Sequence, residues 1–143
     1  MTPFHTRCPE LAARETRGLI IPPGGPLPAG EYGVIEWFCE DPGCDCRRAF
    51  LQVIARHQAD RILASINFGW ESRAFYQRQF PYDPDAPKQI TQGSLDPLNP
   101  QSHLAEAVLR IFQQVIADRA YADRLKRHYQ AFKATLPREK AEG

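Results

Sequence analysis

Residues 31–56 read EYGVIEWFCEDPGCDCRRAFLQVIAR, and this stretch decides the predicted fold. Residues 31–39 and 47–56 are both rich in aromatic and β-branched side chains, which favour β-strands. Between them, residues 41–44 (DPGC) match a type II turn, in which a glycine at the third position supplies a positive φ. The stretch therefore predicts a β-hairpin whose turn carries three cysteines.

A third strand is predicted at residues 61–68 (RILASINF), because apolar side chains recur there at every second position. The connections at residues 40–46 and 57–60 are short, which favours an antiparallel meander over parallel crossovers. The first two strands are apolar on both faces. We therefore expect the sheet to be covered on part of each side.

A C-terminal helical pair is predicted from two amphipathic segments, residues 104–116 and 118–132. Asn99 or Ser102 can cap the first of these helices, and Asp118 can cap the second. The pair is expected to pack its apolar side chains against the sheet.

Two proline-rich segments are expected to lack regular structure. Residues 1–30 are predicted to be mostly irregular, with the prolines at residues 20–28 forming a rigid lead-in. Residues 81–100 are predicted to form a long loop, which follows a short helix at residues 70–80.

Composition and charge exclude several classes of function. Lys and Arg number 18 and Asp and Glu 17, so a net charge of +1 gives no global attraction to nucleic acid or acidic membranes. No apolar run approaches the ~18 residues of a membrane span. Residues 1–17 lack the apolar core of a secretory signal. We therefore expect a cytoplasmic location, where thiols stay reduced.

The four cysteines are therefore candidates for metal binding. Cys44 and Cys46 are two positions apart, so in an extended chain they point to the same side. Cys39 ends the facing strand, and the three sulfurs can converge at one end of the hairpin. Zinc binds thiolates in tetrahedral geometry, which predicts a zinc knuckle here. Plain burial of the cysteines, or a redox pair, is the alternative.

A tetrahedral zinc site needs a fourth ligand, and Cys8 is the favoured candidate because it is the remaining cysteine. The histidines are rival ligands, with His57 disfavoured because it lies at the other end of the predicted second strand. The four rivals are His5, His57, His103 and His128. Each histidine can instead have a purely structural role or lie exposed at the surface.

The run EWFCEDPGCDCRR at residues 36–48 resembles a motif, E-x-x-C-x4-C-x-C-R-R, of a group of uncharacterised bacterial proteins. The resemblance extends to the GWE sequence at residues 69–71 and to HYQAFK at residues 128–133. It implies no activity, so it adds weight to the cysteine motif alone.

Three charged residues in the hairpin have candidate roles. Glu36 becomes a buried carboxylate if its neighbours in the alternation face the core, and such a group is either paired or available for acid–base chemistry. An arginine partner, or a place at the edge of the sheet, is the more usual outcome. Arg47 and Arg48 can neutralise a site of bound thiolates or hold a phosphate, but solvent exposure with local charge balance is the simpler and favoured explanation.

Together these features predict an α+β fold: a three-stranded antiparallel meander with a zinc knuckle at one hairpin, then a short helix and a C-terminal helical pair. With 143 residues, the chain is expected to form a single domain at residues 1–136 and a disordered charged tail at residues 137–143.

The functional prediction is a zinc-binding, non-catalytic interaction module whose partner is another protein or a second copy of the chain. A metal-dependent enzyme with a three-cysteine site is the first alternative. Nucleic-acid binding through Arg47, Arg48 and the last predicted helix is the second, and the acidic residues Glu40, Asp41 and Asp45 beside the arginines disfavour it.

A partner is predicted to dock between the knuckle and the proline-rich loop at residues 81–100, through Tyr82, Ile90 and Leu95. The alternative is that this loop only connects the sheet to the helical pair.

Overall fold

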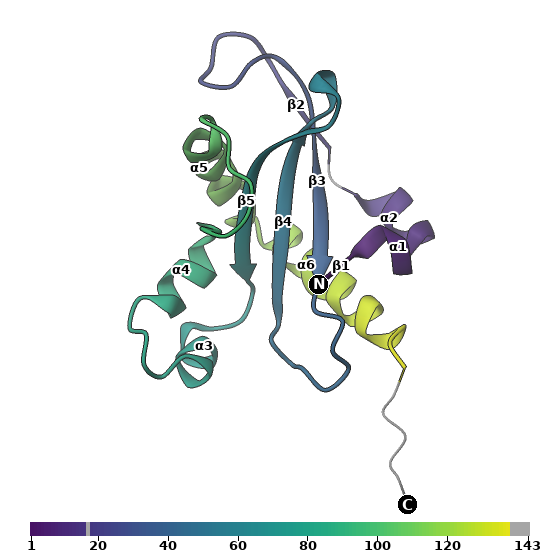
Figure 1. Ribbon diagram of the computed structural model, residues 1–143, viewed down its shortest axis with the longest axis vertical. Helices are drawn as coiled ribbons and strands as arrows, with labels where there is room; N and C mark the ends of the chain where they lie inside the picture. The colour runs from purple at the N-terminus through teal and green to yellow at the C-terminus, as the bar shows by residue number, and fades with distance from the viewer. Residues whose placement is uncertain (17, 138–143) are drawn as a thin grey trace, which may run out of the picture.

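A computed structural model describes residues 1–16 and 18–137. Its centre is an antiparallel meander of β3 (Gly30–Phe38), β4 (Arg48–Ala55) and β5 (Arg61–Gly69), seen face-on in Figure 1. The predicted α+β architecture and its meander are confirmed. The predicted tail lies mostly outside the described residues.

Three short strands extend the meander. β6 (Ser94–Leu95) pairs with β5, whereas β1 (Thr2–Pro3) and β2 (Gly18–Ile21) both pair antiparallel with β3. Because β4 occupies the other edge of β3, β1 and β2 share the free edge. β2 pairs with residues 30–33 of β3 and β1 with residues 37–38, so neither strand pairs with residues 34–36.

The prediction that residues 1–30 are mostly irregular is wrong. This segment contains α1 (Phe4–Arg7) and α2 (Pro9–Glu15) as well as β1 and β2. Phe4 and Ala12 are buried in the main core, so tertiary packing stabilises helices too short to persist alone. Proline also suits the first turn of α2, where its missing N–H costs nothing.

The three helices predicted after the meander are present as α3 (Arg73–Gln79), α5 (Ala105–Ile116) and α6 (Arg119–Ala134). The short connection between β4 and β5 contains a 3-10 helix, η1 (Arg56–Gln58), which was not predicted. Asp118 caps α6 by accepting a hydrogen bond from the backbone N–H of Ala120 at 3.0 Å. α5 begins with Leu104 at its N-cap rather than Asn99 or Ser102. Ser102 instead bonds β5 through the carbonyl of Leu63.

The prediction of a long loop at residues 81–100 is also wrong. The segment contains α4 (Ala86–Gln92) and β6. Ile90 is only 7% exposed and packs with Tyr76 and Ala86 in a small second core. The segment is helical because Ile90 is buried in this core and because a proline in the first turn of α4 costs no hydrogen bond.

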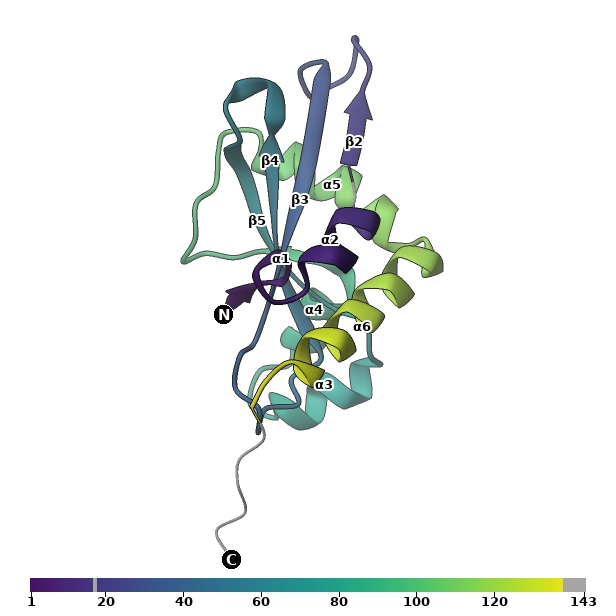
Figure 2. The ribbon, with the colours of Figure 1, turned by 90° about the vertical axis from the view of Figure 1, so that its right-hand side faces the viewer.

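Figure 2 shows the layers nearly edge-on: α5 and α6 lie on one side of the sheet, and the loop before α5 lies on the other. Gln101 in this loop bonds the backbone of Ser65 in β5 through two contacts, at 3.0 and 2.7 Å. The main core lies between the sheet and the helices, and it includes Phe38, Leu51, Ile66, Leu125 and Phe132.

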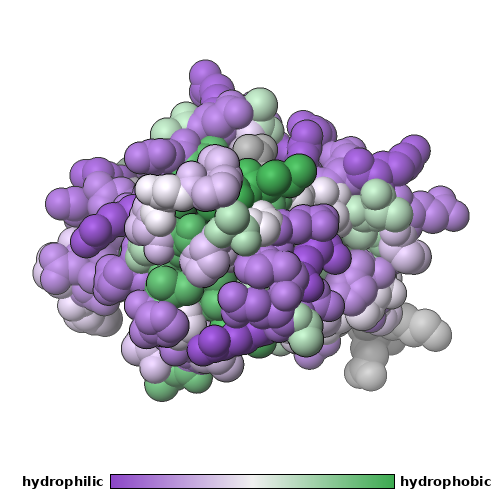
Figure 3. Space-filling view, turned by 90° about the horizontal axis from the view of Figure 1, so that it is seen from above, coloured by the Kyte–Doolittle hydropathy of each residue, from purple (hydrophilic) through white to green (hydrophobic). Residues whose placement is uncertain are grey.

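At the end of the molecule where residues 22–29 connect β2 to β3, the surface is mainly hydrophilic, with some apolar residues gathered near its middle (Figure 3). Ile20 of β2 is an exposed apolar side chain, at 85%. Within the described residues, none of the helices is both long enough and apolar enough to span a bilayer.

Candidate metal centre

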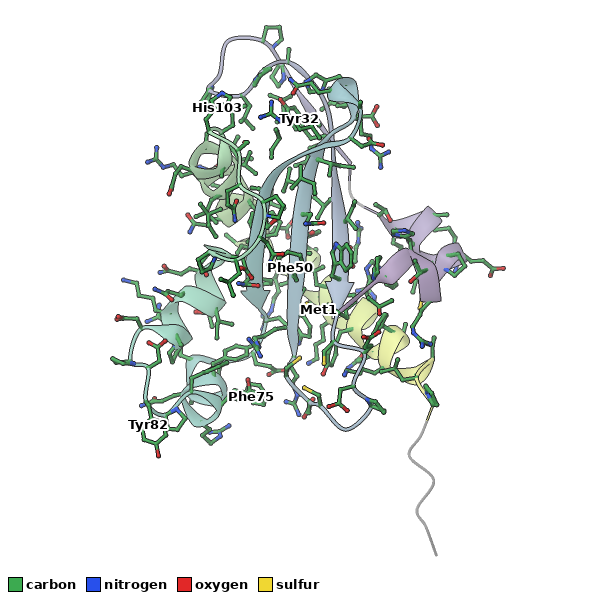
Figure 4. The ribbon with its side chains drawn as sticks, in the orientation of Figure 1. Met1, Tyr32, Phe50, Phe75, Tyr82 and His103 are labelled. Carbon is green, nitrogen blue, oxygen red and sulfur yellow. The ribbon has the colours of Figure 1, made fainter. Side chains whose placement is uncertain are left out.

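Three cysteine sulfurs meet at the turn between β3 and β4. The Sγ atoms of Cys39, Cys44 and Cys46 all lie within 4.8 Å of one another. The three residues flank the turn as the spacing predicts, and the yellow sulfur atoms of the hairpin are visible at the lower end of the sheet in Figure 4. This group could hold a metal ion, because thiolates are soft ligands that converge here on one point.

The turn itself differs from the predicted type. Asp41 organises it: its side chain accepts from the N–H of Gly43 at 2.9 Å, and its carbonyl accepts from the N–H of Cys44 at 3.1 Å. Gly43 does not have a positive φ, so the type II prediction is wrong. The left-handed residue of the hairpin is Arg47, with a φ of 52°.

Two tyrosines hold Arg47 in this unfavourable conformation. The hydroxyl of Tyr76 in α3 donates to the carbonyl of Arg47 at 2.6 Å and accepts from the N–H of Glu71 at 3.2 Å. The hydroxyl of Tyr129 in α6 accepts from the N–H of Arg47 at 3.4 Å. Burial raises the pKa of both phenols, so each keeps its proton and can act as a donor.

Two further side chains grip the turn from opposite sides. The amide of Gln79 in α3 donates to the carbonyl of Asp45 at 3.2 Å, and the ammonium of Lys133 in α6 donates to the carbonyl of Asp41 at 2.8 Å. The cysteine turn is therefore clamped between α3 and α6. Any change in its shape is transmitted to both helices.

The electrostatics of the cysteine group favour a bound cation. Burial, and then the neighbouring Cys46 and Cys39, raise the pKa of the Cys44 thiol to about 11. Three thiolates at this separation repel one another, and a divalent cation between them reverses that repulsion. Cys44 without a cation therefore keeps its proton, and a metal ion that binds here would displace it and neutralise the resulting thiolate.

The arginines after the turn are engaged elsewhere. Arg47 forms two hydrogen bonds with the Asp45 carboxylate, at 3.0 and 2.8 Å, and lies 3.7 Å from Glu71. The hydrogen bonds from Arg47 hold the pKa of Asp45 below its usual value. Arg48 stacks on the ring of Phe80 at 5.0 Å. Local carboxylates thus balance the charge of Arg47, which fits the simpler of the two predicted roles.

Cys8 is not part of the sulfur group. It lies between α1 and α2, where it caps the first helix and packs against the main core. Burial raises the pKa of its thiol, and the nearby Arg7 opposes this effect. Of the four cysteines, the structure therefore brings together three.

The rival histidines are not part of the group either. His57 bonds the carbonyl of Glu31 at 3.1 Å, and His103 lies at the far end of the sheet from the hairpin (Figure 4). His5 is exposed on α1. His128 is buried and makes a different set of contacts.

Glu36 is the buried carboxylate that the alternation in β3 predicts, at 5% exposed. Its partner is His128 of α6 rather than an arginine: the Nδ1 atom of His128 lies 2.6 Å from Glu36 Oε1. The Nε2 atom of the same ring lies 3.1 Å from Glu15 Oε1 of α2, and Phe4 stacks on the ring at 4.4 Å.

Sequence reasoning missed the roles of Tyr76, Tyr129 and Lys133 at the turn. One signal was present, because a tyrosine on the apolar face of a helix needs a partner for its hydroxyl.

Comparisons of the chain with known protein families, with curated proteins and with solved structures find no match. The assignment of function therefore depends on the site alone.

Proposed function

We propose that the chain is a non-catalytic interaction module whose fold is stabilised by one zinc ion at Cys39, Cys44 and Cys46. The convergence of three sulfurs within 4.8 Å carries this proposal. Zinc is the natural occupant, because thiolates are its usual structural ligands and it imposes no redox chemistry. The ion would neutralise the thiolates and fix the turn on which α3 and α6 are clamped.

A metal-dependent enzyme is the second candidate, and the number of gathered ligands favours it. Three thiolates would leave a coordination position for water or substrate. A cleft of about 350 Å³ also lies beside the turn, lined in part by Arg47, Trp70 and Tyr129. Phosphate binding in this cleft is disfavoured, because Glu71 already pairs with the positive charges of Arg47 and Lys126.

The metal itself is tested by purifying the protein without added metal, measuring its zinc content and following thermal unfolding with a chelator under reducing conditions. We expect one zinc per chain and a fall in Tm of at least about 10 °C on chelation. An unchanged Tm after complete loss of the metal would show that its role is not structural.

Paired cysteine variants separate the two candidates. Cys46→Ser should abolish stoichiometric zinc binding, because it removes a thiolate of the sulfur group. Cys8→Ser is the matched variant. A large loss of zinc in Cys8→Ser would identify a closed four-cysteine site and exclude the enzyme, whereas unchanged zinc content and stability would favour an open position at the metal.

Of the three residues predicted to dock a partner, Tyr82 is 98% exposed, whereas Ile90 is buried and Leu95 is half-buried. A protein partner or second copy would bind between this residue and the cysteine turn. Light scattering of the native protein and of Tyr82→Ala tests whether a second copy of the chain binds there.

We propose the cytoplasm as the location, because reduced thiols persist there.

A further inference from the structure

A cleft of about 730 Å³ lies where α1 and α2 cross the free edge of β3. It exists because the edge is interrupted: β1 and β2 pair with β3 on either side of residues 34–36. The helices pass over that gap in place of a third pairing strand. Among the described residues, no strand pairs with the backbone of these three residues on the cleft side.

The lining of the cleft combines apolar side chains with charged ones, among them a buried acid. Apolar contacts come from both the helices and the sheet, at Phe4, Pro9, Ala12, Val34, Ile35 and Ile54. Glu36 also lines the cleft, although its side chain is almost fully buried. Small-molecule sites commonly have this composition and a volume of roughly 300–1,000 Å³.

The charges around the cleft are predominantly negative. The lining contains three carboxylates, of Glu31, Glu36 and Asp60, but one guanidinium, of Arg56, together with His5. Arg56 is 3.9 Å from Glu31, which leaves its charge shared within the lining. His128 contacts Glu36 through one ring nitrogen and Glu15 through the other, and Glu15 also lies 3.4 Å from Arg127.

We propose that this cleft binds a small organic cation with an apolar body, whose ammonium or guanidinium head group bonds to Glu36. The apolar walls receive the body, and the excess of carboxylates favours the positive head group. Hydrogen bonds to a buried carboxylate are charge-assisted and therefore selective for a cationic donor. This site is separate from the cysteine turn, so the proposal stands without the proposed function.

The test uses n-butylguanidinium as the probe, with butyrate and n-butanol as matched molecules of the same chain length. Backbone ¹H–¹⁵N resonances of the full chain are followed during titration. We expect shifts confined to the segments that line the cleft, residues 4–16, 18, 31–36 and 54–60, and an affinity for the cation at least about tenfold above that for butanol. Equal responses to cation and alcohol, or shifts elsewhere, would overturn the proposal.

Two variants locate the site. Glu36→Gln keeps an oxygen that can accept from His128 but removes the charge, and should weaken cation binding at least about tenfold. Ala13→Phe leaves the charges intact and places a ring in the cleft from an exposed position of α2. We expect it to abolish binding, whereas Ala134→Phe, at an exposed position of α6, should not.

Ala13→Phe decides the question if Glu36→Gln does not fold, because it changes neither a buried residue nor a charge. Retention of n-butylguanidinium binding by Ala13→Phe would exclude this cleft as the site. Undiminished binding by a folded Glu36→Gln protein would exclude Glu36 as the group that receives the cation.

Discussion

His128 links three elements through one side chain. Its two ring nitrogens face Glu36 of β3 and Glu15 of α2, while Phe4 of α1 stacks on its ring. In either tautomer of the neutral imidazole one ring nitrogen donates and the other accepts, so each nitrogen is suited to a polar neighbour. The residue therefore joins the N-terminal helices to the sheet and to α6.

Removing this side chain should be costly. His128→Ala leaves the Glu36 carboxylate buried without its partner, and we expect the free energy of unfolding to fall by about 3–5 kcal/mol. Urea denaturation measures this. His103→Ala, at an exposed histidine, is the control and should change stability by less than about 0.5 kcal/mol. Similar losses for the two variants would contradict the role given to His128.

At the scale of elements, the segment between α3 and β6 shows how position decides cost. Ile90 of α4 is buried against Tyr76, whereas Tyr82, in the connection before α4, is almost fully exposed. We expect Ile90→Ala to lower the free energy of unfolding by about 2–5 kcal/mol, because it leaves a cavity. Tyr82→Ala should have an effect within about 0.5 kcal/mol. Denaturation of both variants measures the difference. Equal effects of the two substitutions on the free energy of unfolding would show that α4 is only loosely attached.

The strands and the longer helices could be predicted because their patterns are local. Aromatic and β-branched residues identify β3 and β4, alternating apolar residues identify β5, and helical spacing identifies α5 and α6. α1 and α2 have four and seven residues, too few turns for a periodic pattern. They form because Phe4 and Ala12 enter a core built by distant residues, which local sequence cannot reveal.

The same distinction applies to the candidate sites. The cysteine turn was predictable because its residues are neighbours in sequence. The Glu36–His128 contact joins positions 92 apart, so the alternation in β3 predicts the buried acid but not its partner. The clamp on Arg47 by Tyr76 and Tyr129 has the same character, since it depends on how α3 and α6 pack against the hairpin.

The whole molecule should lose stability in acid. Hydrogen bonds from His128, Thr2 and Arg47 lower the pKa values of Glu15, Glu40 and Asp45 respectively. A carboxylate with a depressed folded pKa contributes stability above its unfolded value, near 4, and this contribution is lost as pH falls through the folded pKa. We therefore expect the urea midpoint to fall as the pH is lowered from about 5 to 3.

Glu15→Gln tests one contribution to this loss. The amide does not titrate, so the variant should be less stable than the native protein near neutral pH and the difference should shrink as the pH falls below about 4. Glu10→Gln, at an exposed position of the same helix, controls for the change of charge. A difference between Glu15→Gln and native protein that is constant with pH would contradict the role of the His128 contact.

The interruption of the free edge of β3 also affects how separate molecules meet. β1 and β2 have two and four residues, and α1 and α2 stand between them along the edge. A short, broken edge offers few consecutive backbone groups to a strand of another chain, which disfavours edge-to-edge aggregation. Joining Pro3 to Gly18 through three residues would align β1 and β2 as one uninterrupted outer strand. Such a shortened chain is expected to associate through that strand and to precipitate at concentrations that the natural chain tolerates.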